Sequence, residues 1–186
     1  MNIGASQPSD YGLYFAWGET QGYTAEQVGD SSERFFGWVD YKYGNGTSSP
    51  ADTEMTKYNT TDGKTVLEAV DDAGVANWGG SWRIPTTAEF QALGAAVNTV
   101  WTQVNNVYGI LCTDKTDSSK TLFFPAAGYC GNGSVEDVGN YGNYWSSSLD
   151  TLRRQFAYVL FFSSYGAGWG NDYGRCCGCA VRPVVG

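Results

Sequence analysis

The strongest constraint on the fold is a run of strand-forming residues near the C-terminal end of the chain, FAYVLFF. Tyr158, Leu160 and Phe162 are two residues apart, the spacing that places side chains on one face of a β-strand. Val159 and Phe161 alternate with them and belong to the opposite face. We therefore expect Tyr158, Leu160 and Phe162 in the core, and Val159 and Phe161 on an exposed contact surface.

A loop rich in Gly and aromatic residues (165–174) follows this strand, and a second short strand (180–184) comes at the end. Large apolar side chains that are directed away from a core are a feature of contact surfaces. We predict that most of the chain is scaffold and that the stretch 144–184 carries the function.

The composition indicates one domain over residues 1–186. A chain of this length buries a sizeable core, and 16% aromatic residues with 25 glycines are typical of short strands and many turns. The net charge of −8 argues against a nucleic-acid partner, because phosphate binding requires clustered Lys and Arg. No apolar run approaches the ~20 residues that a membrane helix needs, so we expect no membrane insertion.

Several kinds of catalytic site are excluded by the residue types. The chain has no histidine, which excludes Ser-His-Asp and Cys-His catalysis and histidine-ligated metals. Five cysteines, an odd number, do not form a complete disulfide framework. The first ten residues lack the basic and apolar parts of a signal peptide.

Local patterns predict an α+β protein with helices early and strands late. Capping boxes at Thr65 and Thr86 predict two helix starts. After Thr86, apolar residues recur at helical spacing, which predicts a helix with an apolar stripe of Phe90, Leu93, Val97 and Trp101. Two apolar runs (108–113 and 121–124) separated by a polar loop predict a β-hairpin.

Five motifs in order carry a resemblance to a known family: DYGLYFAWGET (10–20), NWGGSWRIPTTAEFQAL (77–93), FFPAAGY (123–129), YWSSS (144–148) and VRPV (181–184). Together they resemble the major paralogous domain of gut-bacterial surface and phage proteins. That domain belongs to the C-type-lectin-like superfamily, which also contains formylglycine-generating enzymes. Some of its members are variable proteins of diversity-generating retroelements, in which adenine-directed mutagenesis randomises ligand-contacting residues near the C-terminus.

The resemblance implies a C-type-lectin-like fold with two helices and a twisted antiparallel sheet, and a variable region at about 144–184. Positions that the family keeps fixed match Arg175 and Arg182, for which we expect a structural role. The residues expected to contact ligand are Arg154, Phe156, Val159, Phe161, Tyr165, Ala167, Trp169, Asn171, Asp172, Tyr173, Cys176 and Cys177. Of these we expect Val159, Phe161, Tyr165, Tyr173, Cys176 and Cys177 to be exposed and to form one patch.

The residues at the free positions of the family pattern are compatible with such randomisation. Substituting both adenines of an AAC codon gives Phe, Val or Cys, among others, and excludes Trp, Gln, Lys, Glu and Met. The free positions hold Val159, Phe161, Cys176, Cys177 and Cys179, which are all permitted types.

Other kinds of site were weighed against this interpretation. Cys176, Cys177 and Cys179 lack the usual C-x₂-C spacing of a zinc site. Trp169 to Asp172 resembles a lectin calcium motif with the spacing off by one residue. No two of the 19 acidic residues are paired by sequence as glycosidase carboxylates. We therefore expect no catalytic residues, no metal and no cofactor.

The sequence thus predicts a non-enzymatic ligand-binding domain, either receptor-binding or adhesin, with a hypervariable C-terminal face. The expected partner is a protein or glycan on a cell or virion surface, and the expected location is a phage virion or a cell surface. The oligomeric state is not predicted. Two alternatives are a cysteine- or metal-dependent oxidase of the formylglycine-generating type and a purely structural surface module.

Overall fold

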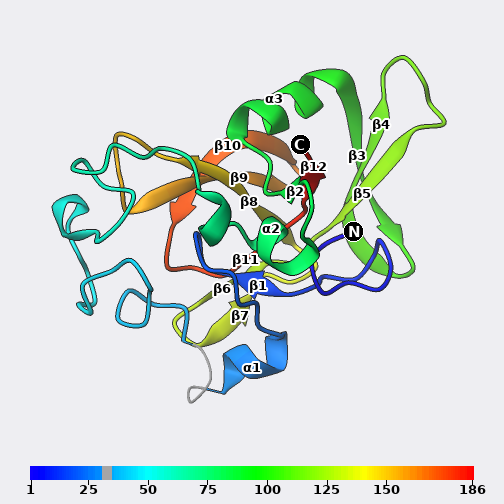
Figure 1. The fold of residues 1–186 in the computed structure, drawn as a ribbon. Coiled ribbons are helices and arrows are strands. Elements are labelled where there is room, and N and C mark those ends of the chain that lie inside the picture. The colour runs from blue at the N-terminus through cyan, green and yellow to red at the C-terminus, as the bar shows by residue number, and fades with distance from the viewer. Residues whose placement is uncertain (31–34) are drawn as a thin grey trace.

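Figure 1 shows a computed structural model of the chain, which describes residues 1–30 and 35–186. The described residues form three α-helices and strands in four sheets, which confirms the α+β class. Within these residues, none of the helices is long and apolar enough to cross a membrane.

The central sheet has five strands in the order β1-β11-β8-β9-β10. β8, β9 and β10 are antiparallel neighbours, whereas β11 runs parallel to β8. β1 pairs with β11, so the two ends of the chain meet in one sheet. The bounds are β1 Tyr14–Phe15, β8 Tyr141–Leu149, β9 Phe156–Ser163, β10 Gly166–Gly174 and β11 Cys179–Ala180.

The core contacts both faces of the middle of this sheet. Leu160 and Phe162 are fully buried, as predicted. The alternation also predicted that Val159 is exposed, and this prediction is wrong, because Val159 is only 1% exposed. It lies opposite the buried Trp145 of β8, whose indole Nε1 donates to the carbonyl oxygen of Phe15 at 2.7 Å. Tyr158, which we expected in the core, is half-buried. In a central strand that is covered on both faces, the side chains of both faces are buried, so the alternation of buried and exposed residues does not apply.

A second sheet, in the order β3-β4-β5, stands beside the central sheet (Figure 1). Before it comes α3, Thr87–Ala96, which begins at the predicted capping box: Thr86 Oγ1 accepts from the Glu89 amide, and Glu89 accepts from the Thr86 amide. The predicted helical stripe through Val97 and Trp101 is wrong, because both residues lie in β3, Val97–Val104.

The helix ends here because the sequence becomes rich in β-branched residues and then reaches a tight turn. Asn105 and Asn106 both have positive φ, 50° and 63°, the conformation of a type I′ turn between β3 and β4, Val107–Asp114. β4 then pairs with β5, Thr121–Pro125, which confirms the predicted hairpin.

The helix predicted from Thr65 does not form. The amide of Leu67 donates to Ser147, and the amide of Leu149 donates to Thr65, so this segment pairs with the end of β8 instead. A 3-10 turn, Ala69–Asp71, follows, and α2, Ala73–Trp78, begins only at the Asp72 N-cap.

The remaining elements are short. α1 spans Ala25–Gly29, with a capping box formed by Thr24 and Gln27. Two small two-stranded sheets pair β6 with β7 and β2 with β12, and a 3-10 turn η1 lies in the long loop that crosses the opposite side of the molecule from β3–β5 (Figure 1). Their bounds are β2 Trp82–Arg83, β6 Tyr129–Gly131, β7 Ser134–Glu136, β12 Val184–Val185 and η1 Asp52–Glu54.

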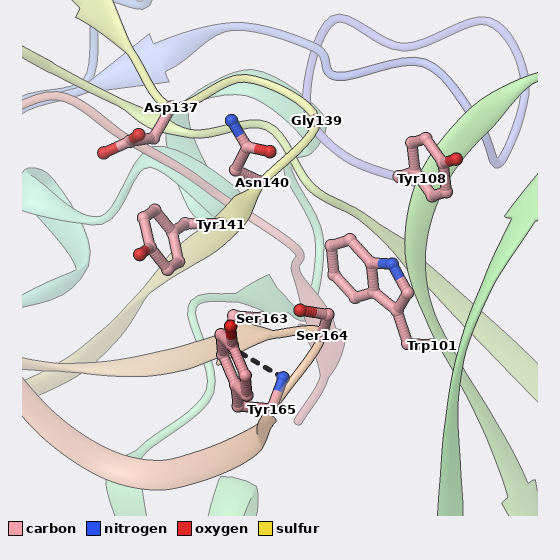
Figure 2. Close-up of a pocket in the computed structure, with 9 residues that line it drawn as sticks. All are labelled: Trp101, Tyr108, Asp137, Gly139, Asn140, Tyr141, Ser163, Ser164 and Tyr165. Atoms are coloured by element: carbon pink, nitrogen blue, oxygen red, sulfur yellow. Dashed lines mark hydrogen bonds between the residues drawn. The ribbon is translucent and has the colours of Figure 1, made fainter.

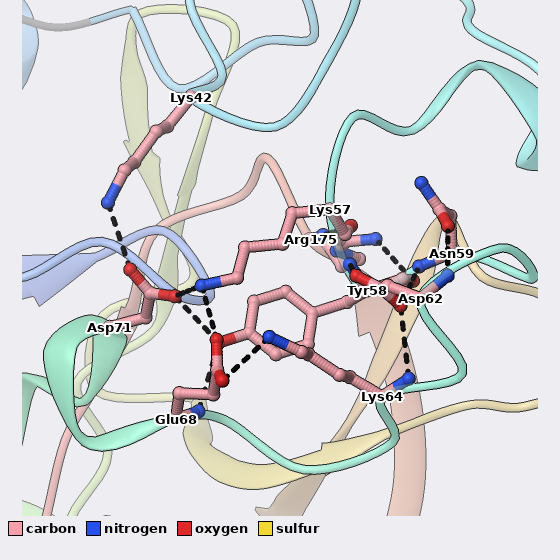
Figure 3. A network of polar contacts seen from close by, with 9 residues as sticks. All are labelled: Lys42, Lys57, Tyr58, Asn59, Asp62, Lys64, Glu68, Asp71 and Arg175. Atoms are coloured by element: carbon pink, nitrogen blue, oxygen red, sulfur yellow. Dashed lines mark hydrogen bonds and ion pairs between the residues drawn. The ribbon is translucent and has the colours of Figure 1, made fainter.

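That long loop, residues 36–68, is held by side chains and is called the pinned loop below. Arg175 is fully buried and donates to Tyr41 Oη (2.9 Å) and to the carbonyl oxygens of Lys57 (3.0 Å) and Arg154 (2.8 Å). The buried Asp71 accepts from Tyr58 Oη at 2.7 Å and pairs with two lysines of the loop (Figure 3). Arg175 therefore has the structural role that we predicted for it.

Candidate functional site

Tyr165 is the most exposed large side chain of the predicted contact surface. It lies at the tip of the β9–β10 hairpin and is 97% exposed, as predicted. Its amide donates to Ser163 Oγ at 3.2 Å, which fixes the backbone of the tip and leaves the ring in solvent (Figure 2). An aromatic ring in this position is available for contact with a ligand.

One hollow beside Tyr165, called the tip hollow, has a volume of about 310 Å³. It brings together four of the predicted contact residues, Phe161, Tyr165, Ala167 and Asn171. Glycines of β10 and Ser163 complete its wall, which consists of Phe161, Ser163, Tyr165, Gly166, Ala167, Gly168 and Asn171. Phe161, one of the lining residues, packs against Tyr141 with ring centroids 5.5 Å apart.

A second and larger hollow of about 500 Å³ lies on the other side of Tyr165, and it is called the aromatic cleft. It is built from three segments that are far apart in the sequence: the β3–β4 hairpin, the turn before β8 and the β9–β10 tip (Figure 2). Its lining is Trp101, Tyr108, Asp137, Gly139, Asn140, Tyr141, Ser163, Ser164 and Tyr165.

Aromatic rings stand on two sides of the cleft. Trp101 and Tyr108 are diagonal neighbours on β3 and β4, and their rings stack with centroids 5.8 Å apart and planes 11° from parallel. Trp101 is held from behind by the buried Phe162, at 6.4 Å between centroids. Figure 2 shows Tyr141 and Tyr165 on the facing side.

The polar groups of the cleft come from a turn whose own backbone is satisfied. Asp137 has a positive φ of 58°, and its carbonyl oxygen accepts from the amides of Asn140 and Tyr141, both at 3.0 Å. Gly139 has φ 81°, and its amide donates to Ala126 at 2.8 Å. This turn is thus fixed by main-chain bonds, and the carboxylate of Asp137 and the amide of Asn140 are left at the cleft.

Trp169, another predicted contact residue, packs against α3 rather than standing free. A Cβ added to Gly94 of α3 would lie 2.6 Å from the Trp169 ring, so the helix approaches the ring as closely as a glycine permits. Trp169 is half-buried at the margin of the core. It supports the hairpin and exposes only part of its ring.

Four more predicted residues lie at the other end of the hairpin, away from Tyr165. Arg154 donates to the carbonyl oxygen of Asn59 at 2.9 Å, and Asp172 pairs with Arg153 at 2.8 Å. Phe156 lies under the Arg153 guanidinium, and Tyr173 packs against Tyr129 with centroids 5.2 Å apart. The single patch that we expected is therefore divided, and these residues already have partners within the protein.

The cysteines form a third group. Cys176 is 5% exposed, so its predicted exposure is wrong: after the end of β10 the chain enters the core at the buried Arg175, and Cys176 follows it there. Cys177 is half-buried, and its sulfur accepts a hydrogen bond from the Cys176 thiol, which lowers the pKa of Cys177. Burial raises the pKa of Cys112 to about 12 and that of Cys179 well above its usual value. All five cysteines are free, and among the described residues no group of three or more acidic or cysteine side chains could hold a metal.

Sequence reasoning missed most of the aromatic cleft. Trp101 was assigned to a helix, and nothing in the sequence links it to residues near 137–141 or 163–165. The sequence contains a partial signal, because the segment 97–104 is rich in β-branched residues, which favour a strand. They are Val97, Thr99, Val100, Thr102 and Val104.

Comparison with known proteins gives no match to any protein family, curated protein or solved structure. The site must therefore be interpreted from its own geometry.

Proposed function

We propose that the chain is a non-enzymatic ligand-binding domain with a C-type-lectin-like fold. Its ligand binds at the tip surface, which consists of the tip hollow and the aromatic cleft. One observation carries the proposal: Tyr165 is 97% exposed on a backbone fixed by hydrogen bonds, and it borders both hollows. A ring held in this way contacts a ligand from either hollow without rearrangement of the hairpin.

The physical chemistry of anchor residues supports this site. Tyr and Trp supply large contact areas while losing little conformational entropy on binding, because each has only two side-chain torsions. The Trp101–Tyr108 stack is preorganised by its contact with Phe162. Preorganised aromatic groups beside small polar residues are typical of surfaces in which a few side chains supply most of the binding energy.

The topology is compatible with the C-type-lectin-like part of the proposal. The two ends of the chain pair in one sheet through β1 and β11, and the sheet is antiparallel apart from the β11–β8 pair. We propose α2 and α3 as the two helices that the resemblance implies. The proposed setting is the tip of a phage tail fibre or a bacterial surface adhesin.

The diversification that the resemblance implies is proposed only for positions that are not buried. Val159, Cys176 and Cys179 are buried, and randomising them would damage the core. Phe161, Tyr165, Ala167 and Asn171 line the tip hollow instead. A diversified surface at these four positions changes the ligand without changing the fold.

Binding is tested with fluorescent tetramers of the chain on a panel of whole bacterial cells. We expect saturable binding to at least one strain, weakened about 30-fold by Tyr165→Ala, the loss that corresponds to a hot spot of roughly 2 kcal/mol. The matched control is Leu152→Ala, since Leu152 is 87% exposed in the β8–β9 connection. Binding that both variants retain equally would rule out the tip surface.

Diversification is tested by sequencing the coding region in many isolates that carry it. We expect substitutions to concentrate at Phe161, Tyr165, Ala167 and Asn171, in codons that contain adenine in a nearby template copy. Leu160 and Phe162 are the internal controls, because they are fully buried. Substitutions spread evenly over buried and exposed codons would contradict retroelement mutagenesis.

A further inference from the structure

The two aromatic sides of the cleft offer flat apolar surfaces to a ligand. Tyr108 is 46% exposed and Tyr165 is 97% exposed, although both are large rings. Rings at these positions lose their contact with water only when a ligand covers them, and burial of that apolar area favours binding. A ligand that fits here therefore has at least one apolar face of ring size.

The same cleft carries hydrogen-bonding groups that the protein leaves free. Among the described residues, no side chain bonds to the Asp137 carboxylate, the Asn140 amide or the Ser164 hydroxyl. These groups donate and accept in several directions around the aromatic rings. A ligand that covered them without hydrogen bonds of its own would leave them unpaired, which is costly. The ligand therefore also carries several hydroxyl or amide groups.

The lining of the cleft also argues against two other classes of ligand. Asp137 is the only charged residue in the described lining, so no Lys or Arg is present to hold a phosphate, sulfate or carboxylate. A quaternary ammonium fits an aromatic cage, but it makes no hydrogen bonds to Asn140 or the serine hydroxyls. A neutral ligand that has both an apolar face and several hydroxyl groups satisfies the whole lining.

The size of the cleft is that of a small-molecule site. Its volume of about 500 Å³ lies within the range of roughly 300–1,000 Å³ that is typical of such sites. A sugar ring combines a face of C–H groups, which stacks on aromatic rings, with equatorial hydroxyls at its edge. One or two sugar units match both the volume and the two kinds of lining group.

We infer that the aromatic cleft binds a neutral glycan. A sugar ring packs between the Trp101–Tyr108 stack and Tyr165, and its hydroxyls bond to Asp137, Asn140 and Ser164. The described lining contains one carboxylate, that of Asp137, so we expect recognition to proceed without calcium. This inference rests on the proposed function, because Tyr165 belongs to both hollows, and it assigns the ligand class to one of them.

The test is titration of the isotope-labelled protein with neutral sugars, observed through the indole N–H signals of its 7 tryptophans. The probes are glucose, galactose, mannose, fucose, N-acetylglucosamine and N-acetylgalactosamine, with their short oligomers. We expect the Trp101 signal, assigned with Trp101→Phe, to shift with at least one probe at a Kd of about 1 mM or tighter. The buried indoles of Trp17 and Trp145, which donate to Ser146 and Phe15, are expected to stay unchanged.

Two variants with a matched control make the result specific to the cleft. Tyr108→Ala and Asp137→Ala change exposed residues, and each is expected to weaken sugar binding at least tenfold with the protein still folded. Val100→Ala is the control, because Val100 is 60% exposed on the neighbouring position of β3. Adding a chelator is expected to leave the titration unchanged.

Several outcomes overturn the inference. These are the absence of a Trp101 shift with every neutral sugar, stronger binding of sialic acid or choline than of any neutral sugar, and loss of binding on chelation. The proposed function fails separately: if cell binding depends on Tyr165 but neutral sugars neither bind nor compete, the tip surface stands and the glycan assignment falls. If cell binding is independent of Tyr165, the proposed function itself falls.

Discussion

Two tyrosines show how differently the pinned loop and the tip of the β9–β10 hairpin use their side chains. Tyr58 lies in a loop with almost no regular backbone structure, yet it is fully buried. Tyr165 lies on a regular antiparallel hairpin, yet it is 97% exposed. In the pinned loop the side chains turn inward and fix the backbone. At the tip, strand pairing and the Ser163 hydroxyl fix the backbone, and the Tyr165 ring is free.

The comparison separates a structural network from a binding surface. The charged cluster around Asp71 in Figure 3 has the residue types of an active site, but its groups are bonded to one another. The groups of the aromatic cleft have exposed faces and unbonded polar atoms. The number of unused interactions, rather than the density of charge, is therefore the basis on which the binding site is proposed.

The largest expected effect comes from removing the centre of the pinned network. Arg175→Met should lower the free energy of unfolding by about 3–5 kcal/mol, because the carbonyl oxygens of Lys57 and Arg154 would stay buried without a donor. The matched control is Arg153→Met, whose side chain is 56% exposed and pairs with the partly exposed Asp172 and the buried Asp150. The loss should be much smaller, because Asp150 keeps its hydrogen bonds from the Leu152 and Arg153 amides. Urea denaturation of both variants measures the difference, and equal losses would show that Arg175 does not hold the loop.

The next effect concerns the two neighbours that the strand alternation assigned to one surface. Val159→Ser should cost roughly 2–4 kcal/mol, because it removes packed methyl groups and buries a hydroxyl. Phe161→Ser, at a half-buried position on the tip hollow, should cost about 1 kcal/mol. If urea denaturation showed a larger loss of stability for Phe161→Ser than for Val159→Ser, the face of β9 that carries Val159 would be open to solvent.

A third prediction uses acid to test the pinned loop. Burial favours a raised pKa for Asp71, but hydrogen bonds from Lys57, Tyr43 and Tyr58 outweigh it and hold the pKa well below its usual range. Because the pKa is depressed in the folded state, the stabilisation is fully present above the ordinary Asp pKa of about 3.9 and is lost as the pH falls toward the folded value. Asp71→Asn should therefore cost roughly 2–3 kcal/mol at neutral pH.

The measurement is urea denaturation of the wild type and Asp71→Asn at pH 7, 5 and 3. The difference between the two proteins should be constant from pH 7 to 5 and smaller at pH 3. Asp137→Asn, which changes an exposed carboxylate at the cleft, should stay within about 0.5 kcal/mol of the wild type at every pH. If the stability difference between the wild type and Asp71→Asn grew in acid, the pKa of Asp71 would be raised rather than lowered in the folded state.

The sequence predicted what local interactions decide. The capping box at Thr86 and the β4–β5 hairpin depend on residues close in the chain, and both form as expected. The stripe of Phe90, Leu93, Val97 and Trp101 fits a helix by spacing. Its second half nevertheless forms a strand, because residues 97–104 are rich in β-branched residues and the Asn105–Asn106 turn follows.

Features that depend on distant segments could not be predicted. The burial of Val159 follows from packing on both faces of β9 by other parts of the chain, which no local alternation encodes. The aromatic cleft joins residues near 101–108, 137–141 and 163–165, and only the fold brings them together. For the same reason the predicted exposure of Tyr165 is confirmed, whereas the prediction that the contact residues form a single patch is wrong.

The smallest expected effect on stability is at the tip itself, and it sharpens the comparison most. Tyr165→Ala should change the free energy of unfolding by less than about 0.5 kcal/mol, because the ring has almost no contact with the protein and the amide–Ser163 bond does not involve the ring. The counterpart is Tyr58→Phe, which removes only the hydroxyl bonded to Asp71 and should cost roughly 1.5–3 kcal/mol, as for a hydrogen bond to a charged group. Denaturation and cell binding are measured in parallel for both variants. Tyr165→Ala should be as stable as the wild type but fail to bind, and Tyr58→Phe should be less stable but still bind. A Tyr165 variant that loses stability would mean that its ring packs within the protein, and the tip would then belong to the scaffold.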